Sequence, residues 1–361
     1  MIYLDYQATT PLAPEAREAM LRWLDGPESG NFGNPHSAHR LGRQAEAAVE
    51  VARERVAALF PPGGRVVFTG SATEALNLAL RGCAPVRAGR PIAVSAIEHA
   101  AVLDTARDLP AETFILPVDS AGLVDPDIAL PDEVGVVAVM QVNNEIGTIQ
   151  RVGELYSRAK AAGALFVCDA VQAAGKVPIA EADLIAISAH KFYGPKGIGA
   201  LWVRDGVDLR PLITGGGQEH GLRSGTLSPA LCSGMGAAAQ LAFDRMEADA
   251  AHVGTLWNRA RELFADWQLN GHAEQRWKGN LNIRREGLDV SRLISDLRQV
   301  MISAGSACAS GSGRPSHVLA AIGLRPDQSR GSIRLGFGRY TIVEQLEAAA
   351  EMINHAAAQQ G

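Results

Sequence analysis

The feature that most constrains the fold is an alternation of helix-like and strand-like stretches from about residue 36 to residue 240. The strand-like stretches are short, continuous and apolar. We expect strands at 65–69, 92–95, 113–116, 134–140, 164–168, 184–188 and 200–203. Short apolar strands that alternate with helices are typical of a mainly parallel sheet covered on both faces. The sequence therefore predicts an α/β fold.

The chain after Pro229 has a different pattern. We expect a helix from Pro229 into the 240s, strands at 281–283 and 332–335, and a final helix from about residue 342. This pattern predicts a large domain over 15–247 and a smaller α+β domain formed by 1–14 and 248–361. Ligands of doubly wound sheets gather at the carboxyl ends of the strands, so the residues after each strand are the candidates for a site.

Charge and cysteine content exclude several classes of protein. The 361 residues carry a formal net charge of −5, which gives no overall attraction to nucleic acid or to an anionic membrane. No apolar run approaches the ~18 residues of a membrane span, and the N-terminus has no signal-type pattern. Four widely separated cysteines without Cys-x-x-Cys spacing predict neither a metal site nor a disulfide framework. We expect a cytoplasmic protein without direct nucleic-acid or membrane contacts.

The strongest candidate for chemistry is Lys191, which follows the strand expected at 184–188 and precedes a Gly-Pro turn. An amine at the end of a buried strand is partly desolvated, and desolvation depresses a lysine pKa as Schiff-base chemistry requires. Ser188 and His190 add donors of the kind that bind phosphate. The alternative is an ordinary surface lysine beside a turn.

Two further strand ends favour the same kind of ligand. Asp169 ends the strand expected at 164–168, with Gln172 three residues later, and an acid there could protonate a pyridine nitrogen. The alternative for Asp169 is a helix N-cap. Residues 69–74 join a strand to a helix whose first amides could bind phosphate. Ser71 and Glu74 also have the spacing of a capping box, which is compatible with that role.

His99 and the pair Asn143–Asn144 follow other strands. The His99 ring could stack on a cofactor ring and transfer protons near neutral pH, although an isolated histidine is more often structural. The paired asparagines could contact a ligand or form a turn. These residues therefore extend the candidate site but do not define its chemistry.

Cys308 and Arg334 lie in the C-terminal part of the chain. Cys308 sits in a Gly/Ser-rich run without large apolar neighbours, and an exposed thiol there suggests reactivity. Cys83, Cys168 and Cys232 lie in apolar contexts and are expected to be structural. Arg334 alternates with apolar residues in a strand, so it either points outward or points inward toward an anion such as a substrate carboxylate.

Taken together, these segments closely resemble the cysteine desulfurases, a branch of the class V aminotransferase-like family of fold-type I pyridoxal-phosphate enzymes. The resemblance runs nearly end to end. Besides the segments above it includes residues 3–11, 32–35, 142–147 and 223–226. The long loop around Cys308 is similar to that of the branch that delivers sulfur to separate acceptors.

The resemblance implies a fold-type I enzyme that uses pyridoxal 5′-phosphate to convert L-cysteine to L-alanine. Lys191 would bind the cofactor covalently, His99 would stack on its ring and assist proton transfer, and Cys308 would hold the sulfur as a persulfide. The implied cofactor contacts are Ala72, Thr73, Asn144, Asp169, Gln172, Ser188, His190 and, across a homodimer interface, Thr226 of the partner subunit. The implied substrate contacts are Asn144 and Arg334.

The resemblance leaves the sulfur acceptor open, with iron–sulfur cluster biogenesis and tRNA thiolation as the candidate destinations. Only one helix is expected after Tyr340, whereas relatives of this branch often carry a longer extension that binds the iron–sulfur scaffold. Competing hypotheses are a selenocysteine lyase or small-amino-acid aminotransferase of the same fold, and a non-catalytic assembly subunit. The Cys308 loop argues against aminotransfer, and the occupied catalytic positions argue against a non-catalytic subunit.

Overall fold

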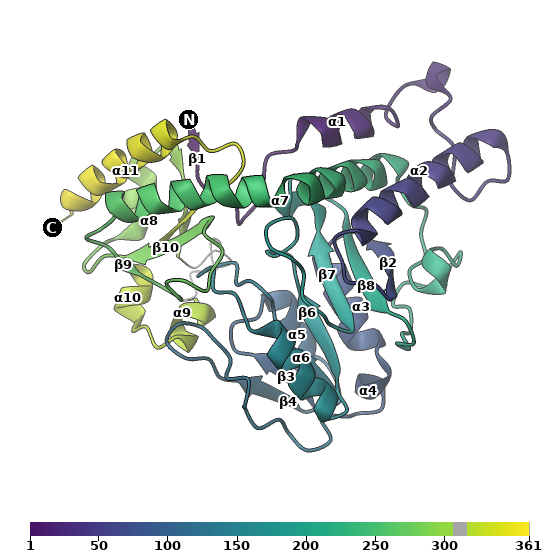
Figure 1. Cartoon of the computed structure of the whole chain (residues 1–361), viewed down its shortest axis with the longest axis horizontal. Helices are drawn as coiled ribbons and strands as arrows, with labels where there is room; N and C mark the ends of the chain where they lie inside the picture. The colour runs from purple at the N-terminus through teal and green to yellow at the C-terminus, as the bar shows by residue number, and fades with distance from the viewer. Residues whose placement is uncertain (306–315, 361) are drawn as a thin grey trace.

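The computed structural model describes residues 1–305 and 316–360 and is built around a seven-stranded sheet (Figure 1). In spatial order the strands are β2 (Gly64–Thr69), β8 (Gly199–Arg204), β7 (Leu184–Ser188), β6 (Leu165–Asp169), β5 (Val136–Ala138), β3 (Ile92–Ser95) and β4 (Thr113–Leu116). Strand β8 runs antiparallel to both of its neighbours, and the other pairs are parallel. The predicted mainly parallel α/β sheet is therefore confirmed.

Helices cover both faces of this sheet because successive residues of each strand point to opposite sides. In β6, Phe166 and Cys168 pack into one apolar cluster and Val167 packs into another. The first cluster includes side chains from α2 (Arg40–Ala57), α6 (Val152–Ala161) and α7 (Pro229–Leu263), and α1 (Pro14–Leu21) lies against α7. The second includes α3 (Ala72–Gly82), α4 (Ala84–Arg87) and α5 (Ala100–Arg107).

A smaller unit stands beside the sheet, at the left of Figure 1. Its four-stranded sheet has the order β12 (Ser303–Ala304), β13 (Ser332–Gly336), β10 (Asn280–Arg284) and β9 (Gln268–Leu269). Helices α8 (Val290–Asp296), α9 (His317–Ala321), α10 (Pro326–Arg330) and α11 (Val343–Ala358) complete it. The division into domains at 15–247 stays a prediction.

Helix α7 is much longer than the sequence suggested. It runs for 35 residues to Leu263 instead of ending in the 240s, and it passes from the large sheet to the small unit. Its second half contains polar residues and Gly254, which weaken the local helical signal. The buried side chains of Val253, Leu256 and Trp257 show what stabilises it, because helices gain most of their stability from the apolar face they bury.

The N-terminal segment runs from the small unit to the large sheet. Strand β1 (Ile2–Tyr3) pairs in parallel with β11 (Val300–Met301), and Asp5 bridges to Gly336 at the end of β13. Further along, the amide of Thr10 donates to the carbonyl oxygen of His190 at 2.9 Å. The segment is therefore fixed to both parts of the molecule by backbone hydrogen bonds.

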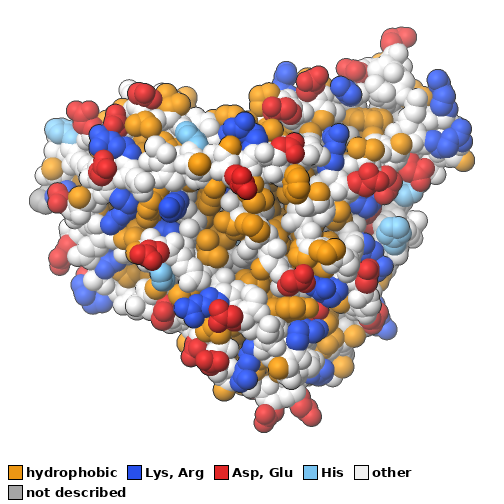
Figure 2. Space-filling view, viewed as in Figure 1, with side chains coloured by type: hydrophobic (Ala, Val, Ile, Leu, Met, Phe, Trp, Pro, Cys, Tyr) orange, Lys and Arg blue, Asp and Glu red, His pale blue; other side chains and the backbone are white. Residues whose placement is uncertain are grey.

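The surface carries charges of both signs across the face in Figure 2, with apolar side chains gathered below the middle of α7. Among the described residues, no helix is both long and apolar enough to cross a membrane. In the same part of the chain no cluster of three or more His, Cys, Asp or Glu side chains could hold a metal ion.

A buried ion pair joins α7 to the loop after β13. The Nε of Arg339 donates to Asp249 Oδ2 at 2.8 Å, and its Nη2 lies 2.7 Å from the same oxygen in the ion pair. The Arg339 guanidinium lies 4.2 Å from the ring centre of Tyr193. We expect Asp249→Ala to lower the free energy of unfolding by about 3–5 kcal/mol, because Arg339 would remain buried without its carboxylate. Denaturant unfolding measures the loss.

The control for this prediction is Asp244→Ala, which removes an exposed carboxylate from the same helix. Its unfolding free energy should change by no more than about 0.5 kcal/mol. Equal losses in the two variants would contradict the assigned role of the buried pair.

Candidate active site

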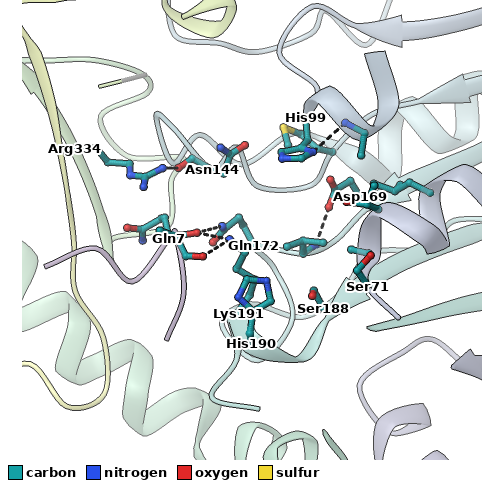
Figure 3. A pocket seen from close by; sticks show the side chains of 17 residues that line it. Gln7, Ser71, His99, Asn144, Asp169, Gln172, Ser188, His190, Lys191 and Arg334 are labelled. Carbon is teal, nitrogen blue, oxygen red and sulfur yellow. Dashed lines mark hydrogen bonds between the residues drawn. The ribbon is translucent and has the colours of Figure 1, made fainter. Parts of the chain in front are cut away.

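A cavity of about 300 Å³ lies where β6 and β7 end and where α3 and α5 begin (Figure 3). The N-terminal segment and β13 supply the rest of its wall. Most of the predicted site residues lie on it: Ala72, Thr73, His99, Asn144, Asp169, Gln172, Ser188, His190, Lys191 and Arg334. The fold therefore brings together wall residues up to 327 positions apart in the chain, from Gln7 to Arg334.

Lys191 ends a single 3₁₀ turn (Ala189–Lys191) that follows β7 directly. Its Nζ donates to the carbonyl oxygens of Gln7 at 2.7 Å and Ala8 at 2.8 Å. Both acceptors belong to the N-terminal segment, so this segment holds the amine in the cavity. An ordinary surface lysine is excluded as an interpretation of Lys191.

Asp169 and His99 lie close enough for each to affect the titration of the other. Asp169 is 5 % exposed, and its Oδ1 accepts from the amide of Val171 at 2.9 Å. Burial raises the pKa of Asp169, and the charges of His99 and Lys191 partly offset this effect. Burial lowers the pKa of His99, whereas the negative charge of Asp169 acts in the opposite direction.

The His99 ring has a defined tautomer when it is neutral. It caps α5, with its Nδ1 accepting from the amide of Ala101 at 3.1 Å. A nitrogen that accepts carries no hydrogen, so the ring hydrogen is assigned to Nε2. His99 is therefore held as a donor through Nε2, and the histidine has both a capping role and a place on the cavity wall.

The amino end of α3 forms another part of the wall. Ser71 Oγ accepts from the amide of Glu74 at 3.2 Å, whereas the Glu74 carboxylate accepts from the amide of Gly70 at 2.6 Å. The amides of Ala72 and Thr73 belong to the first helical turn, where a helix supplies no acceptor of its own. Such amides bind anions, aided by the helix dipole.

Gly199 allows α3 to approach the sheet this closely. A Cβ at this position would lie 2.6 Å from the carbonyl carbon of Ser71 and 2.8 Å from the amide nitrogen of Ala72. Both contacts are to backbone, which cannot move aside as a flexible side chain can. The absence of a side chain at Gly199 therefore helps to place the anion-binding amides against the end of β7.

Ser188 and His190 line the same cavity as the amino end of α3. The Nδ1 of His190 is 3.1 Å from Thr9 Oγ1. Burial lowers the pKa of His190 to about 4, with the charges of Lys191, Lys196 and Lys176 acting in the same direction. The ring is therefore neutral at physiological pH and offers a hydrogen bond without a charge.

Arg334 lies at the opposite side of the cavity from Ser71 and Ser188 in Figure 3. It is 1 % exposed, so the outward-facing alternative is wrong. Its Nη2 donates to Asp5 Oδ1 at 2.7 Å, and its Nη1 donates to the carbonyl oxygen of Asn144 at 3.0 Å. Its buried Nε has no partner among the described residues. The guanidinium is thus fixed in direction while one donor is left for an anion.

Among the described residues, one predicted residue does not lie on this cavity wall. Thr226 is exposed, on the loop that precedes α7, and its contact across a dimer interface stays a prediction. Cys308 lies outside the described residues. The preceding residue that is described, Gly305, donates its amide to the carbonyl oxygen of Ser332 at 2.7 Å. On the other side, Ser316 Oγ donates to Glu145 Oε2 at 2.5 Å.

The other three cysteines, Cys83, Cys168 and Cys232, are buried, as the sequence indicated. Burial raises the pKa of the Cys232 thiol to about 12 and that of Cys168 well above its usual value. Thiols of this kind stay protonated at physiological pH and are poor nucleophiles. None of the three lies on the cavity wall.

Local sequence patterns missed several residues of the wall, among them Gln7, Ala8, Met140 and Val171. Gln7 and Ala8 contribute backbone carbonyl oxygens, which any residue type can supply. The only available signal was the resemblance of residues 3–11 to the desulfurase pattern. Met140 and Val171 are apolar, and nothing in their local sequence separates them from core residues.

Comparisons with known proteins identify the family of the chain. Residues 2–349 match the family described as aminotransferase class-V. The chain belongs to this family. It is 41 % identical over 372 residues to the cysteine desulfurase IscS of Rickettsia bellii, covering 98 % of this chain and 90 % of that protein. Within the family, the chain therefore groups with the cysteine desulfurases.

Solved structures agree with this placement. A NifS-like protein superimposes with a TM-score of 0.91 at 31 % identity, covering 99 % of each chain. A structure described as SspA in complex with cysteine gives a TM-score of 0.82 at 32 % identity, covering 95 % of this chain and all of that one. The fold-type I architecture predicted from the sequence is confirmed.

A buried carboxyl behind the cavity gives a prediction for stability. Glu98 Oε1 accepts from Ser95 Oγ at 2.5 Å and from the amide of Met140 at 2.7 Å, and burial raises the pKa of Glu98 to about 8. The folded state thus holds this proton more tightly than the unfolded state. The contribution of protonated Glu98 to the unfolding free energy is fully present below its pKa in the unfolded chain, about 4.3, and it decreases as the pH rises toward 8.

We expect Glu98→Gln, which resembles the protonated acid, to remove this pH dependence. As the pH rises from 4 to 8, the wild type should lose on the order of 4 kcal/mol of unfolding free energy relative to the variant. Denaturant unfolding across this range measures it. The exposed Glu112→Gln is the control, and a wild-type profile parallel to that of Glu98→Gln would contradict the burial of a neutral acid.

Proposed function

We propose that this chain is a pyridoxal-phosphate-dependent enzyme that takes sulfur from L-cysteine, with Lys191 as the residue that binds the cofactor. The observation that carries the proposal is the composition of one cavity wall. It combines a lysine amine, a strand-end carboxyl group, a helix amino end and a buried guanidinium. Each of these groups matches a different part of the cofactor or of an amino-acid substrate.

The residues present fit the cofactor. The amides of Ala72 and Thr73, with Ser188 and His190, would hold the phosphate, because donors at a helix amino end are suited to an anion. Asp169 would contact the pyridine nitrogen, and a positive charge on that nitrogen would favour the ionised carboxylate. His99 would stack on the ring, and Gln172 would lie near the ring oxygen. Bound in this way, pyridoxal phosphate supplies an electron sink for removal of the α-proton.

The substrate carboxylate is assigned to the Arg334 side of the cavity, with Asn144 beside it. Arg334 Nε is a buried donor without a partner in the described part of the chain, and an incoming carboxylate would satisfy it. Asp5 and the Asn144 carbonyl already fix the orientation of the guanidinium, so the Arg334 side chain would lose little conformational entropy when substrate binds. The SspA structure with cysteine supports a small amino acid as the ligand of this fold.

Proton transfer is assigned to His99 and Lys191. His99 would hold a proton at Nε2, since its Nδ1 is occupied by the Ala101 amide. The free Nζ of Lys191 would be held by the carbonyl oxygens of Gln7 and Ala8. In this position it could accept or donate a proton in the cavity.

Cys308 is assigned as the sulfur acceptor. Its thiolate would attack the sulfur of L-cysteine, so that the new S–S bond forms as the Cβ–S bond breaks and the persulfide stays on Cys308. The carbon skeleton would keep the bonding electrons, take up a proton at Cβ and leave as L-alanine. Sulfur would then pass to an acceptor protein, in iron–sulfur cluster assembly or tRNA thiolation. The proposal includes a homodimer in which Thr226 of the partner subunit completes the phosphate site.

Lys191→Ala tests the cofactor assignment. Purified wild-type protein should absorb in the visible region, and the variant should lose this band because the covalent link needs the amine. The control is Lys196→Ala, which removes an exposed amine five residues away and should keep the band. A visible band of wild-type intensity in Lys191→Ala would show that another residue binds the cofactor.

Cys308→Ala tests the sulfur assignment. With L-cysteine and a reductant the variant should release less than about 1 % of the wild-type sulfide, because no other described thiol reaches the cavity. Its visible spectrum should stay that of the wild type. The control Cys232→Ala removes a buried thiol and should keep most of the activity of the folded protein. Full sulfide release by Cys308→Ala would refute the persulfide role.

A further inference from the structure

A buried lysine that the proposed chemistry does not use lies behind the cavity. Lys176 is 8 % exposed and follows the turn in which Asp169 and Gln172 lie. A buried ammonium is costly, and an apolar residue at this position would avoid the cost. Packing alone therefore does not account for a lysine here.

The backbone directs this side chain inward. The amide of Lys176 donates to the carbonyl oxygen of Ala173 at 2.9 Å, which continues a tight turn after β6. Gly175, the residue before Lys176, has φ +69°, a left-handed backbone conformation that favours glycine. A Cβ there would lie 2.8 Å from the Cβ of Ala242 on α7. The turn thus packs against α7 on one side and presents Gln172 and Lys176 on the other.

Hydrogen bonds connect Lys176 to the amine of Lys191. The Nζ of Lys176 donates to Gln172 Oε1 at 2.7 Å, and Gln172 Nε2 donates to the carbonyl oxygen of Gln7 at 3.0 Å. The same Gln7 oxygen accepts from Lys191 Nζ at 2.7 Å. Because Lys176 occupies the amide oxygen, the Gln172 side chain cannot rotate its amide without losing both contacts.

Lys176 also interacts with Lys191 and His190 through its charge. Burial lowers the pKa of Lys176 to about 7, and the charge of Lys191 acts in the same direction. Among the described residues, Lys191 and His190 are the titratable groups whose charges interact with that of Lys176, and both lie in the turn after β7. Neither is an acid, so neither compensates the buried ammonium.

We propose that Lys176 is a positioning residue that acts on Lys191 through the amide of Gln172 and through its own positive charge. This inference rests on the proposed function, because Lys191 matters only as the residue that binds the cofactor. Because the pKa of Lys176 is about 7, its positive charge is present at neutral and lower pH. A neighbouring positive charge disfavours a second one, so protonated Lys176 favours the neutral form of the Lys191 nitrogen. The amide contact keeps Gln172 Nε2 directed at the Gln7 oxygen.

The test is the pH midpoint of the visible absorbance of the cofactor-loaded protein. Lys176→Met, which keeps the length of the side chain and removes its charge and donor, should raise this midpoint by at least about half a pH unit. Lys176→Gln restores a donor without a charge. It should raise the midpoint as well, but bind the cofactor more tightly than Lys176→Met.

Lys196→Met is the matched control, because it removes an exposed charge that acts on His190 in the same turn. Its midpoint should move by less than about 0.2 units, since solvent screens an exposed charge. The proposal is overturned if neither Lys176 variant shifts the midpoint beyond that of Lys196→Met. A wild-type protein without a visible band would instead refute the proposed function. Lys176→Gln keeps the test valid should Lys176→Met fail to fold.

Discussion

The active site depends on the N-terminal segment, which is hydrogen-bonded to both parts of the molecule. Its first residues extend the small unit through the pairing of Ile2 with Val300, and Thr10 is fixed to the turn that carries Lys191. Between these anchors the carbonyl oxygens of Gln7 and Ala8 face the amine. Because this segment is anchored in both parts of the molecule, we expect the site to form only when both parts have folded.

A second connection also joins the small unit to the large sheet. Helix α7 spans both parts, and its Asp249 binds Arg339 from the loop after β13. Arg339 in turn lies over the Tyr193 ring and donates its amide to the Tyr193 hydroxyl at 2.8 Å. Tyr193 is two residues from Lys191 and has φ +68°, a conformation that a bulky residue adopts only when its surroundings impose it. The small unit therefore shapes the turn that presents the lysine, besides supplying Arg334.

The sequence predicted the parts of the site that follow from local pattern. Asp169, Ser188 and Lys191 were found because they end or follow apolar strands, and strand ends of a parallel sheet meet at one edge. Contacts between distant segments were not accessible in this way. The second half of α7 has a polar local pattern, and it is stabilised by the buried side chains of Val253, Leu256 and Trp257. It also contacts Arg339, 90 positions away, through Asp249. For Arg334, alternation in a strand left its direction open, and only the packing of β13 against β10 and the Asn144 turn decides it.

The ionisable groups around the cavity share one physical condition, which is burial with few compensating charges. Burial raises the pKa of Glu98 and Asp169 and lowers that of His99, His190 and Lys176, so each group is pushed toward its neutral form. A site built in this way costs stability in the empty protein. If the proposed function holds, a dianionic phosphate, a protonated ring and a substrate carboxylate would each bring a charge to this wall, and binding them would offset part of that cost. Ligand binding and protonation of the wall are therefore expected to be linked. We expect the strength of that link to depend also on residues behind the wall such as Lys176, whose contact with Lys191 runs through Gln172 and Gln7.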